Sequence, residues 1–141
     1  MKRLFISLAL IIAVIVSCSE EEKKFEITSS EAFAYSLEDG WELNSTLNVT
    51  GFQQNEEDGE YTAKLSYSLH LVTPESDTIY EADYGYVDKH EKEEIMDIQI
   101  DSQIGIDSSY SIGSYEVIFE ITDDYSMKTI SAVNKFELTT D

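Results

Sequence analysis

The chain has 141 residues, and its 29 aspartate and glutamate residues outnumber its 9 lysine and arginine residues, giving a formal net charge of −20 at pH 7. This balance excludes nucleic acid as a partner, because phosphate binding depends on clusters of cationic side chains. The single cysteine excludes an internal disulfide, so the fold must be stabilised by a hydrophobic core.

The first 17 residues have the composition of a secretory signal. Lys2 and Arg3 form a short positive segment, and residues 4–16 form an uncharged apolar run. A membrane-spanning helix needs about 20 apolar residues, and here Glu20, Glu21 and Glu22 follow the shorter run. We therefore predict a signal peptide over residues 1–17 and not a membrane helix.

The apolar run ends at Ile15-Val16-Ser17-Cys18, which resembles the lipobox of bacterial lipoproteins. The resemblance implies that the signal is cleaved between Ser17 and Cys18 and that the Cys18 thiol carries a diacylglyceryl group. Two or more acyl chains hold a protein on a membrane for long times, so Cys18 is expected to be an anchor. The alternative is an ordinary secretory signal with a buried free cysteine.

Residues 18–24 form an acidic tether after this cysteine. Glu20, Glu21 and Glu22 beside Cys18 resemble the surface-export signal of Bacteroidota-type lipoproteins, which implies an outer-membrane protein facing the cell exterior. The alternative is a solvated tether on a protein that faces the periplasm. Cleavage would remove 2 of the 9 basic residues and leave 7 against 29 acidic ones, a formal charge of −22.

Residues 25–141 have the length of one domain, and apolar and polar residues alternate along them. Residues 61–72 place Tyr61, Leu65 and Leu69 on one face and polar side chains on the other, as in a half-buried strand. The same period predicts strands over residues 41–50, 79–87, 95–106, 115–122 and 130–138. We expect the strand over residues 95–106 to break near Asp101 and Ser102, and residues 88–94 to form a polar loop or one helical turn.

Short turns separate these segments, and Asp58-Gly59 is the strongest hairpin signal among them. About seven strands with almost no helical period predict an all-β, antiparallel β-sandwich. Residues 112–138, which open with Gly113-x-Tyr115, resemble the last two strands of bacterial immunoglobulin-like or fibronectin-III-like domains. This resemblance implies an immunoglobulin-like arrangement; a lipocalin-like or jelly-roll arrangement is the alternative.

Catalytic motifs are absent from the sequence. It contains no G-x-S-x-G, no H-E-x-x-H and no glycine loop that would hold phosphate. His70 falls on the polar face of a predicted strand and His90 in a charged segment, so we expect exposed side chains and not zinc ligands. We therefore predict a protein that is not an enzyme and has no cofactor.

Calcium is the metal that an acidic surface would suit best. The segment around Gly59 fails the spacing of a calcium-binding loop, because its first and twelfth positions are Gln54 and Leu65. Asp123 and Asp124, at the end of a predicted strand, remain as candidate ligands, with Asp39 or Asp107 as further carboxylates. The alternative is a solvated aspartate turn.

Tyr80, Tyr84 and Tyr86 share one face of a predicted strand. If exposed, they form an aromatic strip that suits sugar rings or a protein partner. If buried, they form the core face of the strand, and we favour this because Glu81 and Asp83 on the other face need water. The sequence as a whole predicts a membrane-anchored, non-enzymatic module that binds an envelope protein. The alternatives are a module that binds a glycan through this strip and a calcium-binding module of the adhesion type.

Overall fold

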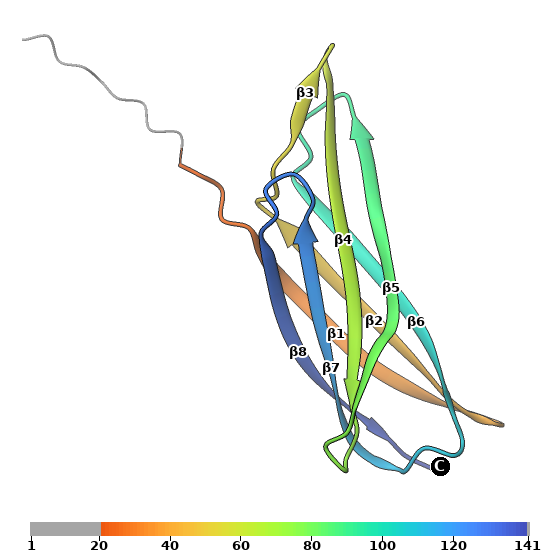
Figure 1. The fold of residues 1–141 in the computed structure, drawn as a ribbon. Helices are drawn as coiled ribbons and strands as arrows, with labels where there is room; N and C mark the ends of the chain where they lie inside the picture. Colours follow the sequence, from red (N-terminus) through yellow and green to blue (C-terminus); the bar gives the residue numbers. More distant parts are fainter. Residues whose placement is uncertain (1–20, 141) are drawn as a thin grey trace, which may run out of the picture.

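The computed structural model describes residues 21–140, which form eight β-strands in two antiparallel sheets packed face to face (Figure 1). The predicted signal peptide, the segment that resembles a lipobox and Cys18 lie outside these described residues. Residues 21–140 include no helix that is long and apolar enough to cross a membrane.

Three strands form the first sheet, here called sheet A, in the order β1-β2-β6. Its strands are β1 (Glu26–Leu37), β2 (Gly40–Thr50) and β6 (Asp97–Asp107). The second sheet, sheet B, contains β3 (Asn55–Glu57), β4 (Glu60–Val72), β5 (Thr78–Glu91), β7 (Gly113–Asp123) and β8 (Thr129–Leu138). In sheet B, β4 pairs with β5 along one edge and with β3 and β7 along the other, and β7 pairs with β8.

This all-β, antiparallel sandwich confirms the predicted fold class. The chain passes between the sheets after β2, after β5 and after β6, as it does in immunoglobulin-like sandwiches. Tyr115, near the start of β7, donates a hydrogen bond from its hydroxyl to the carbonyl oxygen of Ser111 at 2.7 Å. A tyrosine near the start of a strand that bonds back to the backbone of the preceding connection is a hallmark of the immunoglobulin fold.

The core lies between the sheets, where every second residue of the central strands is buried. Each large apolar side chain among them contributes about 1.5–3 kcal/mol when fully buried. The predicted alternation is confirmed for β2, β4 and β7. The largest apolar side chains that are less than 2% exposed are Leu43, Leu47, Leu65, Leu69, Leu138, Tyr115, Phe119 and Ile121.

Strand β1 is not predicted by the alternation, because its polarity is inverted. The small residues Ala32 and Ala34 pack against the core, whereas Phe33 and Tyr35 face solvent. Two further predictions are wrong. Strand β6 runs unbroken through Asp101 and Ser102, and Asp88 to Glu91 continue β5, because its partner β4 extends far enough to pair with them.

The two open sides of the sandwich are closed by polar contacts. Asn134, which interrupts the apolar face of β8, donates from Nδ2 to the Ser30 carbonyl oxygen at 3.0 Å, and the Ser30 hydroxyl donates to Asn134 Oδ1 at 2.6 Å. This pair joins β8 to β1. On the opposite side the Ser102 hydroxyl donates to the Asp83 carboxylate and joins β6 to β5.

Candidate functional site

The three tyrosines of β5 lie on the outer face of sheet B, the face turned away from sheet A. Their exposed fractions are 76% for Tyr80, 71% for Tyr84 and 81% for Tyr86, and together we call them the tyrosine strip. The core-face interpretation favoured from the sequence is therefore wrong. Positions on the inner side of β5 are taken instead by smaller side chains, of which Ile79, Ala82 and Val87 pack against the core.

A bulge in β5 sets the position of Tyr80. The pairing with β4 shifts between Leu69 and Leu71, so that residues 80–82 lie opposite His70 alone. Glu81 adopts a φ of 50°. This left-handed conformation is uncommon for residues other than glycine, asparagine and aspartate. The strip is therefore built on an irregular strand, and His70 is the side chain that faces the irregularity.

His70 is half-buried, with 12% of its side chain exposed, so the prediction of an exposed side chain is wrong for this histidine. The side chain is held in place because it bonds on both sides of its ring. Nδ1 accepts a hydrogen bond from the Glu81 backbone N–H at 2.9 Å, and Nε2 lies 2.8 Å from Glu120 Oε2. Because Nδ1 accepts, the ring proton lies on Nε2 and is donated to Glu120. The Tyr80 ring packs edge-on against the imidazole, with centroids 5.6 Å apart. His70 is thus a positioning residue for the bulge and for Tyr80.

The structure does not bring the two histidines together. His90 pairs with Thr62 at the other end of β4, where its Nε2 lies 2.9 Å from Asp88 Oδ1 and its Nδ1 3.4 Å from Glu60 Oε1. Among residues 21–140, no three histidine, cysteine, aspartate or glutamate side chains are grouped so that they could hold a metal ion.

A shallow depression of about 690 Å³ lies beside the strip. Tyr84 and Tyr86 form one wall. Hydroxyl groups from β4, β7 and β8 and the carboxylate of Glu120 form the floor. The polar lining residues are Ser66, Ser68, Glu81, Glu120, Thr122 and Thr129. Such a surface combines aromatic faces with hydrogen-bonding groups.

Gly85 allows β5 to pass close to a tyrosine of β4. A Cβ atom at this position would lie 2.6 Å from the hydroxyl oxygen of Tyr67, so a larger residue would displace that ring. Burial raises the pKa of Tyr67, and the nearby Asp83 carboxylate raises it further. Tyr67 therefore supports β5 from the inside, directly beneath the stretch that carries Tyr84 and Tyr86.

Asp123 and Asp124 have hydrogen-bonding roles in the turn after β7. The Asp123 carboxylate is buried and accepts bonds from the Gln53 N–H at 2.8 Å, the Tyr125 N–H at 3.0 Å and the Ser126 hydroxyl at 2.8 Å. The Asp124 carboxylate accepts from the Ser66 hydroxyl at 2.8 Å. Asp39 and Asp107 lie at the opposite end of the sandwich, beside the β1–β2 turn, so these four carboxylates do not meet.

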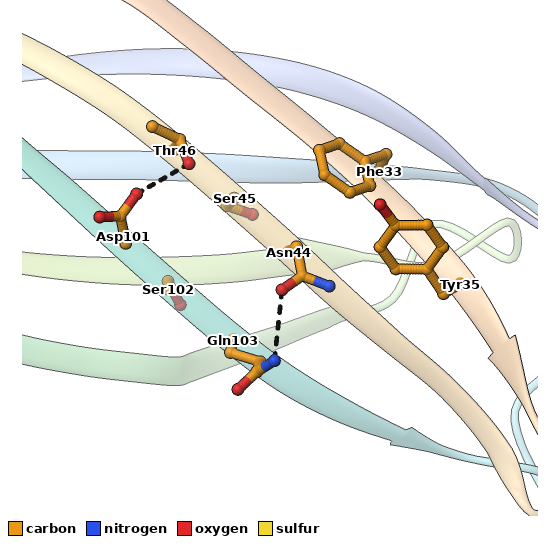
Figure 2. A pocket seen from close by; sticks show the side chains of 8 residues that line it. All are labelled: Phe33, Tyr35, Asn44, Ser45, Thr46, Asp101, Ser102 and Gln103. Atoms are coloured by element: carbon orange, nitrogen blue, oxygen red, sulfur yellow. Dashed lines mark hydrogen bonds between the residues drawn. The ribbon is translucent and has the colours of Figure 1, made fainter.

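A second aromatic surface, which the sequence analysis missed, lies on the outer face of sheet A. Phe33 and Tyr35 of β1 pack edge to face, with centroids 5.0 Å apart and ring planes at 81°. They stand beside a hollow of about 440 Å³ whose polar rim is formed by Asn44, Thr46, Asp101 and Gln103 (Figure 2). The alternation of alanine with aromatic residues in residues 32–35 was the signal that could have revealed it.

Side chains of β2 and β6 on this face bond to one another. Glu42 Oε1 accepts from Gln103 Nε2 at 2.7 Å and from Asn44 Nδ2 at 3.1 Å. The Thr46 hydroxyl donates to Asp101 Oδ1 at 2.8 Å (Figure 2). These contacts hold a row of amide and carboxylate groups beside the aromatic pair.

Comparisons with known proteins bear on the fold alone. No family model matches the chain, and no curated protein matches it. A family 123 glycoside hydrolase from Clostridium perfringens, studied for hydrolysis of glycolipid glycans, has a similar fold with a TM-score of 0.53 and 14% sequence identity. The match covers 77% of this chain and 22% of the hydrolase chain. At this identity the likeness supports the sandwich and no shared activity.

Proposed function

We propose that this protein is a lipid-anchored, non-enzymatic module of the bacterial cell envelope that binds a partner protein through the tyrosine strip. The observation that carries the proposal is the exposure of Tyr80, Tyr84 and Tyr86, 71% to 81%, along a single strand. Tyrosine supplies a large contact area at a low cost in side-chain entropy, and it is enriched among the residues that dominate binding.

The edge of β5 supports a protein partner. Within residues 21–140, β5 pairs with β4 only, which leaves backbone N–H and C=O groups along its other edge. An extended segment of a partner can add to such an edge while its side chains contact the tyrosines. The inward-facing Asp83 and the bulge at residues 80–82 restrict this pairing, so the regular stretch from Tyr84 onward is the expected docking edge.

Charge specifies the chemistry of the partner. Glu81 and Glu120 flank the strip, and acidic residues outnumber basic ones 29 to 9 in the whole chain. A partner surface that presents arginine or lysine would form ion pairs with these carboxylates and cation–π contacts with the tyrosines. Binding should therefore weaken as the salt concentration rises.

The lipobox at residues 15–18 and the acidic residues after it support the anchor and an outer-membrane, surface-exposed location, with the periplasmic face as the alternative. The described chain enters the sandwich at the end that carries the β3–β4 hairpin (Figure 1). Residues 18–25 would span at most about 27 Å when fully extended. With Cys18 acylated, β5 would thus be displayed a short distance from the membrane.

A glycan is the second candidate ligand of the strip. The depression beside Tyr84 and Tyr86, with its hydroxyl-lined floor, is the observation that favours it. A glycan array screened with the wild-type protein and with a variant in which all three strip tyrosines are alanine separates the two ligands. Array binding that survives the triple substitution would exclude a glycan at this site.

Chemical crosslinking in intact cells tests the protein partner. The full chain carries a C-terminal tag, and the variant Tyr80→Ser/Tyr84→Ser/Tyr86→Ser is compared with the matched control Tyr35→Ser, a tyrosine that is 55% exposed on the other sheet. We expect one crosslinked product that is lost in the triple variant, retained in Tyr35→Ser and weakened by salt. The proposal is wrong if the products are the same in both variants, or if the purified protein turns over a substrate without any partner.

A further inference from the structure

We infer that the outer face of sheet A is a separate binding site for neutral carbohydrate. The site consists of Phe33 and Tyr35 on β1, Glu42 and Asn44 on β2, and Gln103 on β6, and we call it the aromatic–amide face. It lies on the opposite side of the sandwich from the tyrosine strip, and it uses different residues. The inference therefore does not depend on the function proposed for the strip.

The aromatic half of this face offers apolar ring surface to solvent. Phe33 is 44% exposed and Tyr35 55% exposed, although both lie on a regular strand whose other side packs on the core. Their edge-to-face contact fixes each ring relative to the other. Sugar rings carry patches of C–H groups that pack against aromatic side chains in this way, so a held pair of rings provides a platform for them.

The polar half supplies oriented hydrogen-bonding groups for hydroxyls. Gln103 and Asn44 both donate to the same oxygen of Glu42, and this fixes the planes of the two amides. An amide can donate two and accept two hydrogen bonds, and a carboxylate accepts about four. Each of the three side chains therefore keeps capacity for a ligand whose hydroxyls both donate and accept.

The shape of the surface leaves room beside Tyr35. Tyr35, Glu42 and Gly105 pair in sequence across the three strands, and a Cβ added at Gly105 would meet nothing within 4 Å. With strands spaced by about 4.8 Å, the open position lies two strands away from the Tyr35 ring. The hollow of about 440 Å³ lies on the same face, and Phe33, Tyr35 and Gln103 are among the residues that line it (Figure 2).

Charge selects neutral over anionic ligands. Strands β1, β2 and β6 contain no lysine or arginine, whereas Glu31, Glu42 and Asp101 lie on the outer face of sheet A. Phosphorylated, sulfated or uronic-acid glycans would be repelled, since these three strands offer no cation to pair with them. A second copy of this chain would likewise bring an acidic face against an acidic face.

Affinity electrophoresis in native gels tests the inference directly. The strongly negative chain migrates fast, so a neutral polymer in the gel that binds it will retard it visibly. The probes are hydroxyethylcellulose, xylan, galactomannan, mixed-linkage β-glucan and dextran, with polygalacturonate and heparin as anionic controls. Oligosaccharides of any retarding polymer are then titrated calorimetrically into the wild-type protein and its variants.

We expect at least one neutral polymer, and neither anionic one, to retard the protein. Tyr35→Ala and Gln103→Ala should each weaken binding about tenfold or more. Both side chains point to solvent, and a thermal melt of each variant verifies the fold. The strip variant Tyr84→Ser should bind carbohydrate as the wild type does. This comparison distinguishes binding at the aromatic–amide face from binding at the tyrosine strip.

Four results would overturn the inference. The first is that none of the neutral polymers retards the protein, and the second is that the double variant Phe33→Ala/Tyr35→Ala still binds. The third is that Tyr84→Ser loses as much binding as Tyr35→Ala does. The fourth is a dimer in solution that Tyr35→Ala dissociates. The last result would assign the aromatic–amide face to a second copy of the chain.

Discussion

Replacing Asp123 with alanine should destabilise the fold more than any other single loss of a carboxylate. The Asp123 side chain is 1% exposed, and it accepts hydrogen bonds from three backbone N–H groups, those of Gln53, Tyr125 and, at 3.4 Å, Ser126, and from the Ser126 hydroxyl. Through these bonds it joins the β7–β8 turn to the segment that leaves sheet A after β2.

The size of the effect follows from the donors that are left without an acceptor. A buried donor that loses its acceptor costs about 1–3 kcal/mol. The Ser126 hydroxyl can rotate toward another acceptor and the Ser126 N–H bond is long, so the N–H groups of Gln53 and Tyr125 carry most of the loss. Asp123→Ala should therefore lower the free energy of unfolding by about 3–5 kcal/mol, a large share of the about 5–15 kcal/mol that is typical of a domain.

Urea unfolding followed by circular dichroism measures this difference from the shift in midpoint at constant slope. Asp124→Ala is the matched control, because its carboxylate bonds to the side chain of Ser66 and is only half-buried; we expect a loss below about 1 kcal/mol. The reasoning is refuted if Asp123→Ala unfolds within about 1 kcal/mol of the wild type. A midpoint that rises with calcium in the wild type but not in Asp123→Ala would instead make Asp123 a metal ligand.

Three further predictions concern the core and the bulge. Ser45 has a buried hydroxyl without a hydrogen-bond partner among the described residues, so Ser45→Ala should raise the urea midpoint, by about 1 kcal/mol in free energy. Burial raises the pKa of Tyr115 above its ordinary value of 10.0, so the folded chain holds this proton more tightly than the unfolded chain does. The contribution of Tyr115 to stability should be constant below pH 10 and fall as the pH rises above it; equal urea midpoints at pH 8.5 and pH 11 would contradict this. His70→Ala should speed hydrogen exchange at the Glu81 amide, and unchanged protection would show that His70 does not hold the bulge.

The sandwich could be predicted because burial is periodic in most of its strands. In β2, β4 and β7 most of the alternate side chains are apolar and buried, and Asp58-Gly59 forms the two-residue turn between β3 and β4, with φ of 53° and 77°. These signals are local, because each depends only on residues that are close together in the sequence. The order of the strands within the sheets depends on contacts between distant segments, which a single sequence does not contain.

The two aromatic surfaces could not be assigned for the same reason. Whether Tyr84 lies in the core or in solvent depends on which face of β5 meets sheet A. The charges of Glu81 and Asp83 led to the wrong prediction that the tyrosine face is buried. Asp83 faces inward because Ser102 of the opposite sheet donates a hydrogen bond to its carboxylate. Phe33 and Tyr35 were missed because a strand with alanines inside and aromatics outside inverts the usual pattern.

Hydroxyl-radical footprinting of the tyrosine strip, in the isolated protein and in intact cells, tests most directly whether this surface binds a partner. In the isolated protein, Tyr80, Tyr84 and Tyr86 should be oxidised readily, and the buried Tyr115 should not. In cells the three strip tyrosines should be protected relative to Tyr110, an exposed tyrosine of the β6–β7 loop. Oxidation of the strip at the same rate in both settings would show that no partner covers it.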